Sequence, residues 1–309
     1  MTSKQSLPNS YAQLSLDGIR FSHHPASSPS VTPIVLVQLH RPAHRNAFTH
    51  EMAHSLVTAF NLLSADDRVR AVILTSSDES NKTFCVGMDL KAGGPSRLEL
   101  EGPRATTDHR DMGGAVGLAI YRCNKPVIAA LNGTAVGIGI TMALPATIRI
   151  ASRDAKIGFV FARRGFTMEA CSSFFLPRLI GASRALHLLS VAAPYPATHD
   201  LLKDLFSQVV APDQVLPCAL AIAEDMVANV SLVASTIMKD MIYRGPASPE
   251  EAHLLESNLF LSLFLSQDAQ EGKESFLQKR TPDFQGTMAD APPVYPWWAP
   301  VNVKPKSHL

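Results

Sequence analysis

Residues 125–152, KPVIAALNGTAVGIGITMALPATIRIAS, place two short apolar runs on either side of a glycine-rich turn. The runs 125–133 and 147–152 predict buried strands, because each is apolar, short and bounded by turn residues. The middle, AVGIGITMALPA, predicts a turn that opens into a helix. Strands that alternate with helices are typical of an α/β domain whose sheet is covered by helices.

The same alternation begins earlier in the chain. PIVLVQL (33–39) and VRAVILTS (69–76) predict two more buried strands. Between them, THEMAHSLVTAFNLLSAD predicts a helix with Thr49 as its N-cap. Its apolar residues recur at helical spacing: Met52, Leu56, Ala59, Phe60 and Leu63.

After residue 181 the pattern becomes helical. Segments starting near 183, 212, 231 and 249 predict successive helices, with Gly245-Pro246 and Ser248-Pro249 as breaks. The helical stretch 249–279 carries more apolar surface than a terminal helix needs, which favours oligomerisation. From 281 the chain is rich in proline, and we expect it to be extended.

The composition excludes several classes of protein. In a chain of 309 residues with 46% hydrophobic and 18% charged residues, a large core can be buried. The 28 basic and 27 acidic residues leave no global charge for binding nucleic acid. The four cysteines are scattered, which argues against a disulfide framework or a zinc site: Cys85, Cys123, Cys171 and Cys218.

The two ends of the chain bear on its location. The N-terminus lacks the apolar stretch of a secretion signal, and no window approaches eighteen uninterrupted apolar residues, so no membrane span is expected. The last residues are Ser307, His308 and Leu309, a conservative variant of the Ser-Lys-Leu peroxisomal address. We therefore expect a peroxisomal protein that meets the import receptor; an uninformative polar tail is the alternative.

Five segments together resemble the crotonase superfamily, the enoyl-CoA hydratase and isomerase family. They are LHRPAHRNAF (39–48), FCVGMDLK (84–91), residues 125–152, GFVFARRGFTMEACSSFFLPRLIG (158–181) and EGKESFLQKR (271–280). The resemblance implies a spiral of ββα units followed by a helical trimerisation region. It implies an acyl-CoA substrate with no separate cofactor or metal, and a homotrimer or hexamer.

The resemblance also divides the chain into four parts. They are an N-terminal segment (1–30), a crotonase α/β core (31–197), a helical oligomerisation region (198–280) and an extended tail with the targeting tripeptide (281–309).

Two glycine-rich segments can present backbone N–H groups to a ligand. Gly87 allows a loop conformation that other residues resist, and Gly137 precedes a predicted helix, where N–H groups are unpaired. Two such donors make an oxyanion hole for a thioester enolate. The resemblance assigns them to the N–H groups of Met88 and Ile138; the alternative is that the glycines only permit tight turns.

The resemblance further implies a set of substrate- and CoA-binding residues around these loops and at the C-terminal end. For the cations among them, simple surface solvation is the alternative. The set is Arg45, Cys85, Val86, Gly87, Asp89, Leu90, Gly137, Phe276 and Lys279.

The acidic residues bear on the reaction. Hydratases of the family use two glutamates, and the matching positions here are Thr141 and Phe161, neither of which can act as a base. Glu169 lies in a Gly-x-x-x-Glu frame that is similar to the peroxisomal Δ3,Δ2-enoyl-CoA isomerases, which implies that it is the catalytic base. The alternative is a first-turn helix acid favoured by the helix dipole.

An apolar pocket raises the pKa of a carboxylate and makes it a stronger base. Nearby apolar residues can supply such a pocket or be ordinary core: Phe161, Met168, Phe166 and Phe174.

Three hypotheses follow. The first is an isomerase in which Glu169 moves a proton from C2 to C4. The second is a hydratase of fatty-acid or secondary metabolism in which Glu169 acts with His109 or Asp111. The third is a non-catalytic acyl-CoA-binding subunit, which the two absent glutamates allow.

Overall fold

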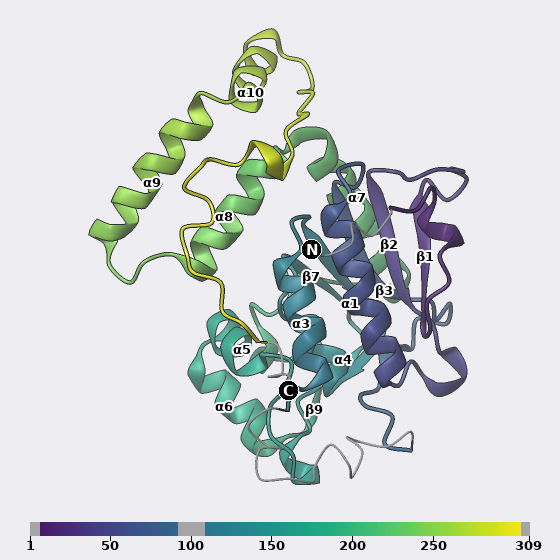
Figure 1. Cartoon of the computed structure of the whole chain (residues 1–309). Coiled ribbons are helices and arrows are strands. Elements are labelled where there is room, and N and C mark those ends of the chain that lie inside the picture. The colour runs from purple at the N-terminus through teal and green to yellow at the C-terminus, as the bar shows by residue number, and fades with distance from the viewer. Residues whose placement is uncertain (1–6, 92–108, 304–309) are drawn as a thin grey trace, which may run out of the picture.

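The computed structural model describes residues 7–91 and 109–303. Within them the chain forms two sheets with helices around them (Figure 1). The larger sheet has the order β1-β2-β3-β5-β7-β10 and the smaller one β4-β6-β8-β9. The strands of the larger sheet are β1 (Ile19–His24), β2 (Ile34–Leu39), β3 (Ala71–Ser76), β5 (Val127–Leu131), β7 (Ile148–Ser152) and β10 (Gln208–Val210). Those of the smaller sheet are β4 (Thr83–Cys85), β6 (Thr134–Val136), β8 (Lys156–Gly158) and β9 (Pro194–Pro196).

The chain alternates between the two sheets as a spiral. Each of the pairs β3 and β4, β5 and β6, and β7 and β8 contributes one strand to the larger sheet and the next to the smaller one. All neighbours within this spiral pair in parallel, whereas β1 and β9 join the edges antiparallel. The helices α1 (His50–Ala65), α3 (Met112–Arg122) and α4 (Ile138–Thr141) precede β3, β5 and β7. The predicted spiral of ββα units is therefore confirmed.

Strand alternation explains the two faces of the larger sheet. Successive side chains of a strand point to opposite faces, so the apolar runs feed two cores. Val72 and Leu74 join the core that includes α1 and α3, whereas Ile73 joins a second core with Ala219 of α7 (Val215–Asn229). Because both faces are covered, β3 is buried along its whole length.

Helix α1 forms as the sequence predicts. Its N-cap is Thr49, whose Oγ1 accepts a hydrogen bond from the Met52 N–H at 3.3 Å. The five apolar residues that set its periodicity are completely buried. This cap fixes where α1 begins, and with it the position of the residues just before the helix.

The remaining helices are α5 (Ser172–Ile180), α6 (Ala182–Val191), α8 (Leu232–Arg244), α9 (Pro249–Phe264) and α10 (Gln267–Gln278). The stretch 249–279 is two helices rather than one, because Ser266 caps a new helix by accepting from the Ala269 N–H at 3.2 Å. Helices α9 and α10 project from the body of the molecule (Figure 1). Phe260 and Phe264 of α9 are 71% and 60% exposed.

The C-terminal tail runs back along α8 towards α5, in yellow in Figure 1. Trp297 donates from Nε1 to the Arg244 carbonyl at 3.0 Å, and Arg110 donates from Nε to the Val303 carbonyl at 3.2 Å. The tail therefore ends, within the described residues, next to the segment that precedes α3.

The domain boundaries drawn from the sequence stay a prediction. The larger sheet takes β1 from the segment 1–30 and β10 from the region 198–280, in addition to its strands from the core. Leaving out the residues that the structure does not describe, no single helix is long and apolar enough to cross a membrane. The bent pair Pro212–Asn229 and Leu232–Arg244 passes on length and composition alone.

Candidate active site

A cavity of about 140 Å³ lies where the start of α1, the loop after β4, the start of α3, α4 and the segment before α5 meet. It collects six of the residues to which the sequence analysis gave a chemical role: Met88, Asp89, His109, Asp111, Ile138 and Glu169. Six others complete its lining: Phe48, Thr49, His50, Glu51, Met112 and Gly113.

In the loop after β4, the backbone N–H of Met88 points away from the adjacent segment at Phe48. The Phe48 N–H donates to the Gly87 carbonyl and the Asp89 N–H donates to the Phe48 carbonyl, both at 2.8 Å. In a parallel bridge of this kind the middle residue, Met88, directs its own N–H to the opposite side. Gly87 has φ +101°, a conformation that L side chains rarely adopt, so the turn depends on glycine.

An ion pair between Arg41 and Asp89 fixes this loop. Arg41 Nη2 lies 3.2 Å from Asp89 Oδ2, and Arg41 Nη1 also donates to the Ala47 carbonyl. Asp89 was expected to bind substrate or CoA. It lines the cavity, and its carboxylate bonds to Arg41 fix the loop that carries the Met88 N–H.

The second donor lies at the start of α4. Gly137 has φ +57°, and its N–H donates to the Gly158 carbonyl at 2.8 Å, which leaves Ile138 as the first helical residue. Helix α4 is a single turn of four residues, shorter than the helix predicted from AVGIGITMALPA. The Ile138 N–H is one of the first-turn donors that have no partner within the helix, although the dipole of so short a helix is small.

Close backbone packing brings the two donors together. A Cβ atom on Gly139 would overlap the Cys85 carbonyl oxygen, so β4 and α4 approach as closely as glycine allows. Cys85 itself is fully buried, and burial raises the pKa of its thiol to about 12. Cys85 thus supports the loop through its backbone, and its side chain does not line the cavity.

Glu169 reaches the cavity from a strained stretch of backbone. Ala170 and Cys171 have φ +52° and +57°, and α5 begins only at Ser172. Glu169 therefore lies outside the helix, and the alternative of a first-turn helix acid is wrong. Positive φ at two successive non-glycine residues is costly and is characteristic of functional sites.

The carboxylate of Glu169 is partly buried and contacts two neighbouring elements. Its Oε1 accepts a hydrogen bond from the hydroxyl of Thr141, and its Oε2 lies against Gly113, where a Cβ atom would overlap it. Burial raises the pKa of Glu169 to about 7; the Thr141 hydroxyl lowers it, and the charge of Asp111 raises it further. A carboxyl group with a pKa near neutrality is suited to both accept and return a proton.

Asp111 connects the start of α3 to the segment that follows Glu169. Its Oδ1 accepts from the Gly114 N–H at 2.5 Å, as the N-cap of α3, and from the Ala170 N–H at 3.4 Å. His109 lies beside it at the rim of the cavity. Both residues that the sequence analysis named as partners for Glu169 are therefore close to it.

Other predicted residues lie elsewhere. Val86, Gly87, Leu90 and Gly137 adjoin the two donor segments without lining the cavity. Arg45 is exposed at the end of a short 3-10 helix, Pro42–His44. Phe276, 82% exposed, and Lys279 lie on and just after α10, and no described residue of α10 lines this cavity.

The expected apolar wall differs from the observed one. Phe166 is 57% exposed, and none of the four apolar residues proposed from 161–174 lines the cavity. Phe161, Met168 and Phe174 pack against the main core instead. The wall is built from residues distant in sequence, Phe48, Met88, Met112 and Ile138. Phe48 belongs to a segment of the family resemblance, but no signal local to Met112 or Gly113 marks them as lining.

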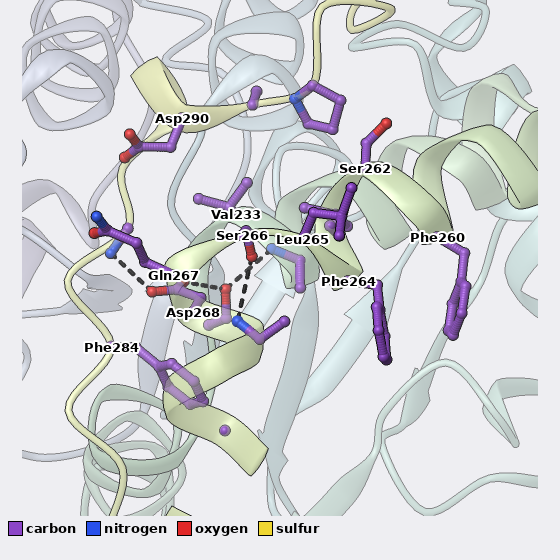
Figure 2. Close-up of a pocket in the computed structure, with 18 of the residues that line it drawn as sticks. Val233, Phe260, Ser262, Phe264, Leu265, Ser266, Gln267, Asp268, Phe284 and Asp290 are labelled. Carbon is purple, nitrogen blue, oxygen red and sulfur yellow. Dashed lines mark hydrogen bonds between the residues drawn. The ribbon is translucent and has the colours of Figure 1, made fainter. Parts of the chain in front are cut away.

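A larger pocket of about 740 Å³ lies between α8, α9, α10 and the tail (Figure 2). Figure 2 shows Phe260 and Phe264 on α9 at one side of it and Asp268 at the start of α10. The Asp268 carboxylate accepts from the Ser231 hydroxyl at 2.5 Å and from the Gly286 N–H at 3.0 Å. Its carboxylate thus joins α8, α10 and the tail, and the pocket contains neither of the donor segments nor Glu169.

Comparison with known proteins identifies the family. The family model described as enoyl-CoA hydratase/isomerase matches residues 31–287. Enoyl-CoA hydratase AFT3-1 of Alternaria alternata is 47% identical over 263 residues, which cover 85% of this chain and 86% of that protein. Enoyl-CoA hydratase EchA19 of Mycobacterium tuberculosis is 31% identical over 81% of this chain and 92% of its own.

Solved structures show the same fold. A putative enoyl-CoA hydratase from Streptomyces coelicolor A3(2) superimposes with a TM-score of 0.78 at 26% identity, covering 93% of this chain and 98% of that one. The spiral fold and a match over most of the chain lead to one conclusion: the chain belongs to the enoyl-CoA hydratase/isomerase family of the crotonase superfamily.

Proposed function

We propose that the protein is an enoyl-CoA hydratase that adds water across the 2,3 double bond of an acyl-CoA thioester. The observation that carries this proposal is the position of Glu169, a partly buried carboxylate in a cavity formed partly by Met88 and Ile138. The names of the relatives, which are hydratases, support hydration over the isomerisation suggested by the sequence frame around Glu169. Coenzyme A arrives with the substrate, and the proposed reaction needs no other cofactor.

The proposed reaction uses these groups in the following order. The thioester oxygen accepts hydrogen bonds from the N–H groups of Met88 and Ile138. As water oxygen bonds to C3, Glu169 takes a proton from the water, and the electron pair of the double bond moves through C2 to the thioester oxygen. Glu169 then returns the proton to C2, which restores the carbonyl. The product has gained one hydroxyl at C3 and one hydrogen at C2.

Asp111 compensates for the missing second glutamate in this proposal. It lines the same cavity as Glu169, so its carboxylate is available to accept a hydrogen bond from the attacking water. His109 at the rim offers an alternative for the same task. Neither residue lies at the position of Thr141 or Phe161. In this proposal the water therefore approaches Glu169 from the side of the cavity at the start of α3.

A second candidate function is Δ3,Δ2-enoyl-CoA isomerisation. It is favoured by one observation: the two family glutamate positions carry Thr141 and Phe161, while Glu169 lines the cavity together with Met88 and Ile138. A single base can take a proton from C2 and return it at C4 through the same enolate.

One experiment separates these functions. Purified protein is incubated with paired 2-enoyl-CoA and 3-enoyl-CoA substrates, and the products are identified by mass and chromatography. Hydration gives the mass of one added water from the 2-enoyl substrate, whereas isomerisation converts the 3-enoyl substrate at constant mass. Binding of both thioesters with no turnover would instead indicate a non-catalytic subunit.

The assignment of Glu169 is tested by Glu169→Gln, which keeps the shape of the side chain and removes the base. We expect turnover to fall roughly 100-fold to 10,000-fold. Glu79→Gln, exposed in the turn between β3 and β4, is the matched control and keeps full activity. Full activity of Glu169→Gln would contradict the proposed mechanism.

We also propose that the protein is imported into peroxisomes through Ser307, His308 and Leu309, which lie outside the described residues. A fluorescent protein fused to the N-terminus reports the location. Removal of the tripeptide is expected to disperse the signal into the cytosol.

We propose further that the exposed apolar face of α9 is covered by other copies in a trimer or hexamer. That contact would bring Phe276 or Lys279 of one copy towards the CoA of another, whereas Arg45 would meet a CoA phosphate within its own copy. Light scattering of Phe260→Asp is expected to show smaller particles than wild type, because a charge on this face opposes burial.

A further inference from the structure

Thr141 occupies one of the two positions where the family's hydratases carry a glutamate, and its hydroxyl makes hydrogen bonds of its own. Its side chain is completely buried, and its hydroxyl contacts two oxygens at once. One is Oε1 of Glu169, and the other is the carbonyl oxygen of Gly137 at 3.2 Å. A hydroxyl has a single proton, so it can donate fully to only one of them at a time.

The charge of Glu169 decides between these two acceptors. When Glu169 is ionised, Oε1 is the stronger acceptor, because hydrogen bonds to a charged group are about twice as strong as neutral ones. When Glu169 has taken a proton on Oε2, the oxygen that faces Gly113, Oε1 loses its charge and accepts more weakly. The hydroxyl proton is then released to the Gly137 carbonyl.

The Gly137 carbonyl belongs to the peptide unit that supplies the second oxyanion donor. This peptide consists of the Gly137 C=O and the Ile138 N–H, and a hydrogen bond to its oxygen makes its N–H a stronger donor. The carbonyl also accepts from the Ile140 and Thr141 N–H groups, each at 3.1 Å, so it is never left without a partner. The Thr141 hydroxyl therefore adds polarisation to this peptide without being required for its stability.

We propose that Thr141 is a positioning residue that couples the protonation of Glu169 to the strength of the Ile138 oxyanion donor. In the resting state its hydroxyl holds the carboxylate with Oε2 towards the cavity. When Glu169 takes a proton, the enolate forms at the same moment, and the hydroxyl turns to the Gly137 carbonyl and strengthens the bond to the enolate oxygen. When Glu169 returns the proton, the hydroxyl turns back.

This coupling rests on the proposed function only in needing an enolate held by Ile138. Hydration and isomerisation both pass through a protonated Glu169 beside an enolate, so the coupling holds for either reaction. It also makes a prediction about the free protein, since the hydrogen bond to ionised Glu169 exists without substrate.

Other ionisable groups face Glu169 and have to be considered. Asp111 approaches from the start of α3, and the thiols of Cys85 and Cys171 lie close enough to be influenced by its charge. The cavity also contains further titratable side chains: His50, Glu51, Asp89 and His109. A comparison of variants at Thr141 alone keeps all of these groups constant.

The first measurement is the titration of Glu169 in the free protein. Infrared difference spectroscopy monitors its carboxyl band, and the loss of that band in Glu169→Gln identifies it. Thr141→Val removes the hydroxyl at constant shape, and the pKa of Glu169 is expected to rise by about one unit. Thr141→Ser restores the hydroxyl and the wild-type titration. An unchanged pKa in Thr141→Val overturns the proposal.

The second measurement tests how strongly the N–H of the Gly137–Ile138 peptide donates to a bound thioester. Butyryl-CoA, a saturated thioester with no double bond to hydrate, is bound and its carbonyl band is recorded at pH values of about 5.5 and about 8.5, on either side of the Glu169 titration. In wild type the band lies at lower frequency at the acidic pH, where the hydroxyl bonds to Gly137. We expect this shift to vanish in Thr141→Val and to remain in Thr141→Ser; equal shifts in wild type and Thr141→Val overturn the coupling.

Thr236→Val is the matched control. Thr236 is also buried and donates to a backbone carbonyl, that of Asn124 at 2.8 Å, but it lies on α8 outside the cavity. With turnover assays, Thr141→Val is expected to lower kcat about tenfold with little change in KM, because the lost polarisation acts on the enolate. Thr236→Val leaves kcat unchanged. A wild-type protein that turns over no enoyl-CoA would contradict the proposed function, whereas the titration of Glu169 would still test Thr141.

Discussion

A Cβ atom on Gly113 would overlap Oε2 of Glu169 and lie 2.8 Å from Cδ1 of Ile138, so the glutamate reaches the cavity only because position 113 has no side chain. Gly113 is the second residue of α3, where glycine is otherwise a poor choice. Its presence is explained by the carboxylate beside it.

Gly113→Ala is therefore expected to displace Glu169 and to lower kcat/KM by roughly 100-fold or more, since a misplacement of about 1 Å has this effect. Gly272→Ala in α10 is the matched control, because its Cβ would meet only Phe284 at 3.5 Å, an ordinary contact. Steady-state kinetics and circular dichroism separate the loss of activity from loss of fold. Wild-type kinetics in Gly113→Ala would show that Glu169 is not held where the structure places it.

The pH dependence of kcat/KM follows from Glu169. Burial raises its pKa to about 7, and the reaction begins with the ionised form. Activity should be constant above this pKa and should fall about tenfold for each pH unit below it. The same cavity is lined by other titratable residues: Asp111, Asp89, Glu51, His50 and His109. The acidic limb of the kcat/KM profile is therefore assigned to Glu169 by repeating the measurement with Asp111→Asn. Removal of that neighbouring charge should move the limb to lower pH.

The close approach of Gly139 to the Cys85 carbonyl packs α4 against the strand that leads into the Met88 loop. Gly139→Ala is expected to push α4 away from β4 and to lower kcat roughly 100-fold to 1,000-fold, the usual effect of losing one oxyanion donor. Binding of butyryl-CoA, measured by calorimetry, should weaken far less than kcat falls. Equal losses in binding and turnover would indicate a general disruption of the loop.

Asp66 illustrates a stability effect far from the cavity. It is buried at the end of α1 and accepts from the Tyr11 hydroxyl at 3.1 Å and from Arg68 Nε at 2.8 Å. Burial alone would raise the pKa of Asp66, but the bonds from Arg68 and Tyr11 outweigh it and hold the pKa below its usual value. A lowered pKa stabilises the folded state above the unfolded pKa, and the stabilisation is lost as the pH falls through the folded one.

Asp66→Asn should therefore lower the free energy of unfolding by about 1–3 kcal/mol at neutral pH. The difference from wild type should shrink below pH of about 4. Urea denaturation at several pH values measures this, with the exposed Asp154→Asn as the control. A difference that persists unchanged at acidic pH would mean that the charge of Asp66 is not involved.

Local signals in the sequence were sufficient for some elements. Thr49 with the spacing of Met52 and Leu56 predicts α1 to within a residue of its start. Strands β2, β3, β5 and β7 of the larger sheet follow from apolar runs, whereas β1, IRFSHH, has no such run and was not predicted. The short strands of the smaller sheet lack the length to show any period. The break between α9 and α10 carries a readable signal, Ser266 at an N-cap, that the strong apolar spacing around it obscured.

The site was predictable where one residue determines the local backbone and not where distant segments meet. Gly87 and Glu169 were named from the sequence, and both contribute to the structure around the cavity. The wall formed by Phe48 and Met112 depends on how α1 and α3 pack beside the loop after β4, which no local pattern encodes. Phe166 illustrates the reverse, an apolar residue near Glu169 in sequence that points away from the core.

The hydrogen bond from Arg110 to the Val303 carbonyl has a practical consequence for how the protein is handled. It places Val303 beside Arg110, which lies between the cavity-lining residues His109 and Asp111. A purification tag fused after Leu309 would begin only six residues beyond Val303, and it would also cover the terminal tripeptide. Protein for kinetic and spectroscopic work is therefore better tagged at the N-terminus, with the native C-terminal residues left free.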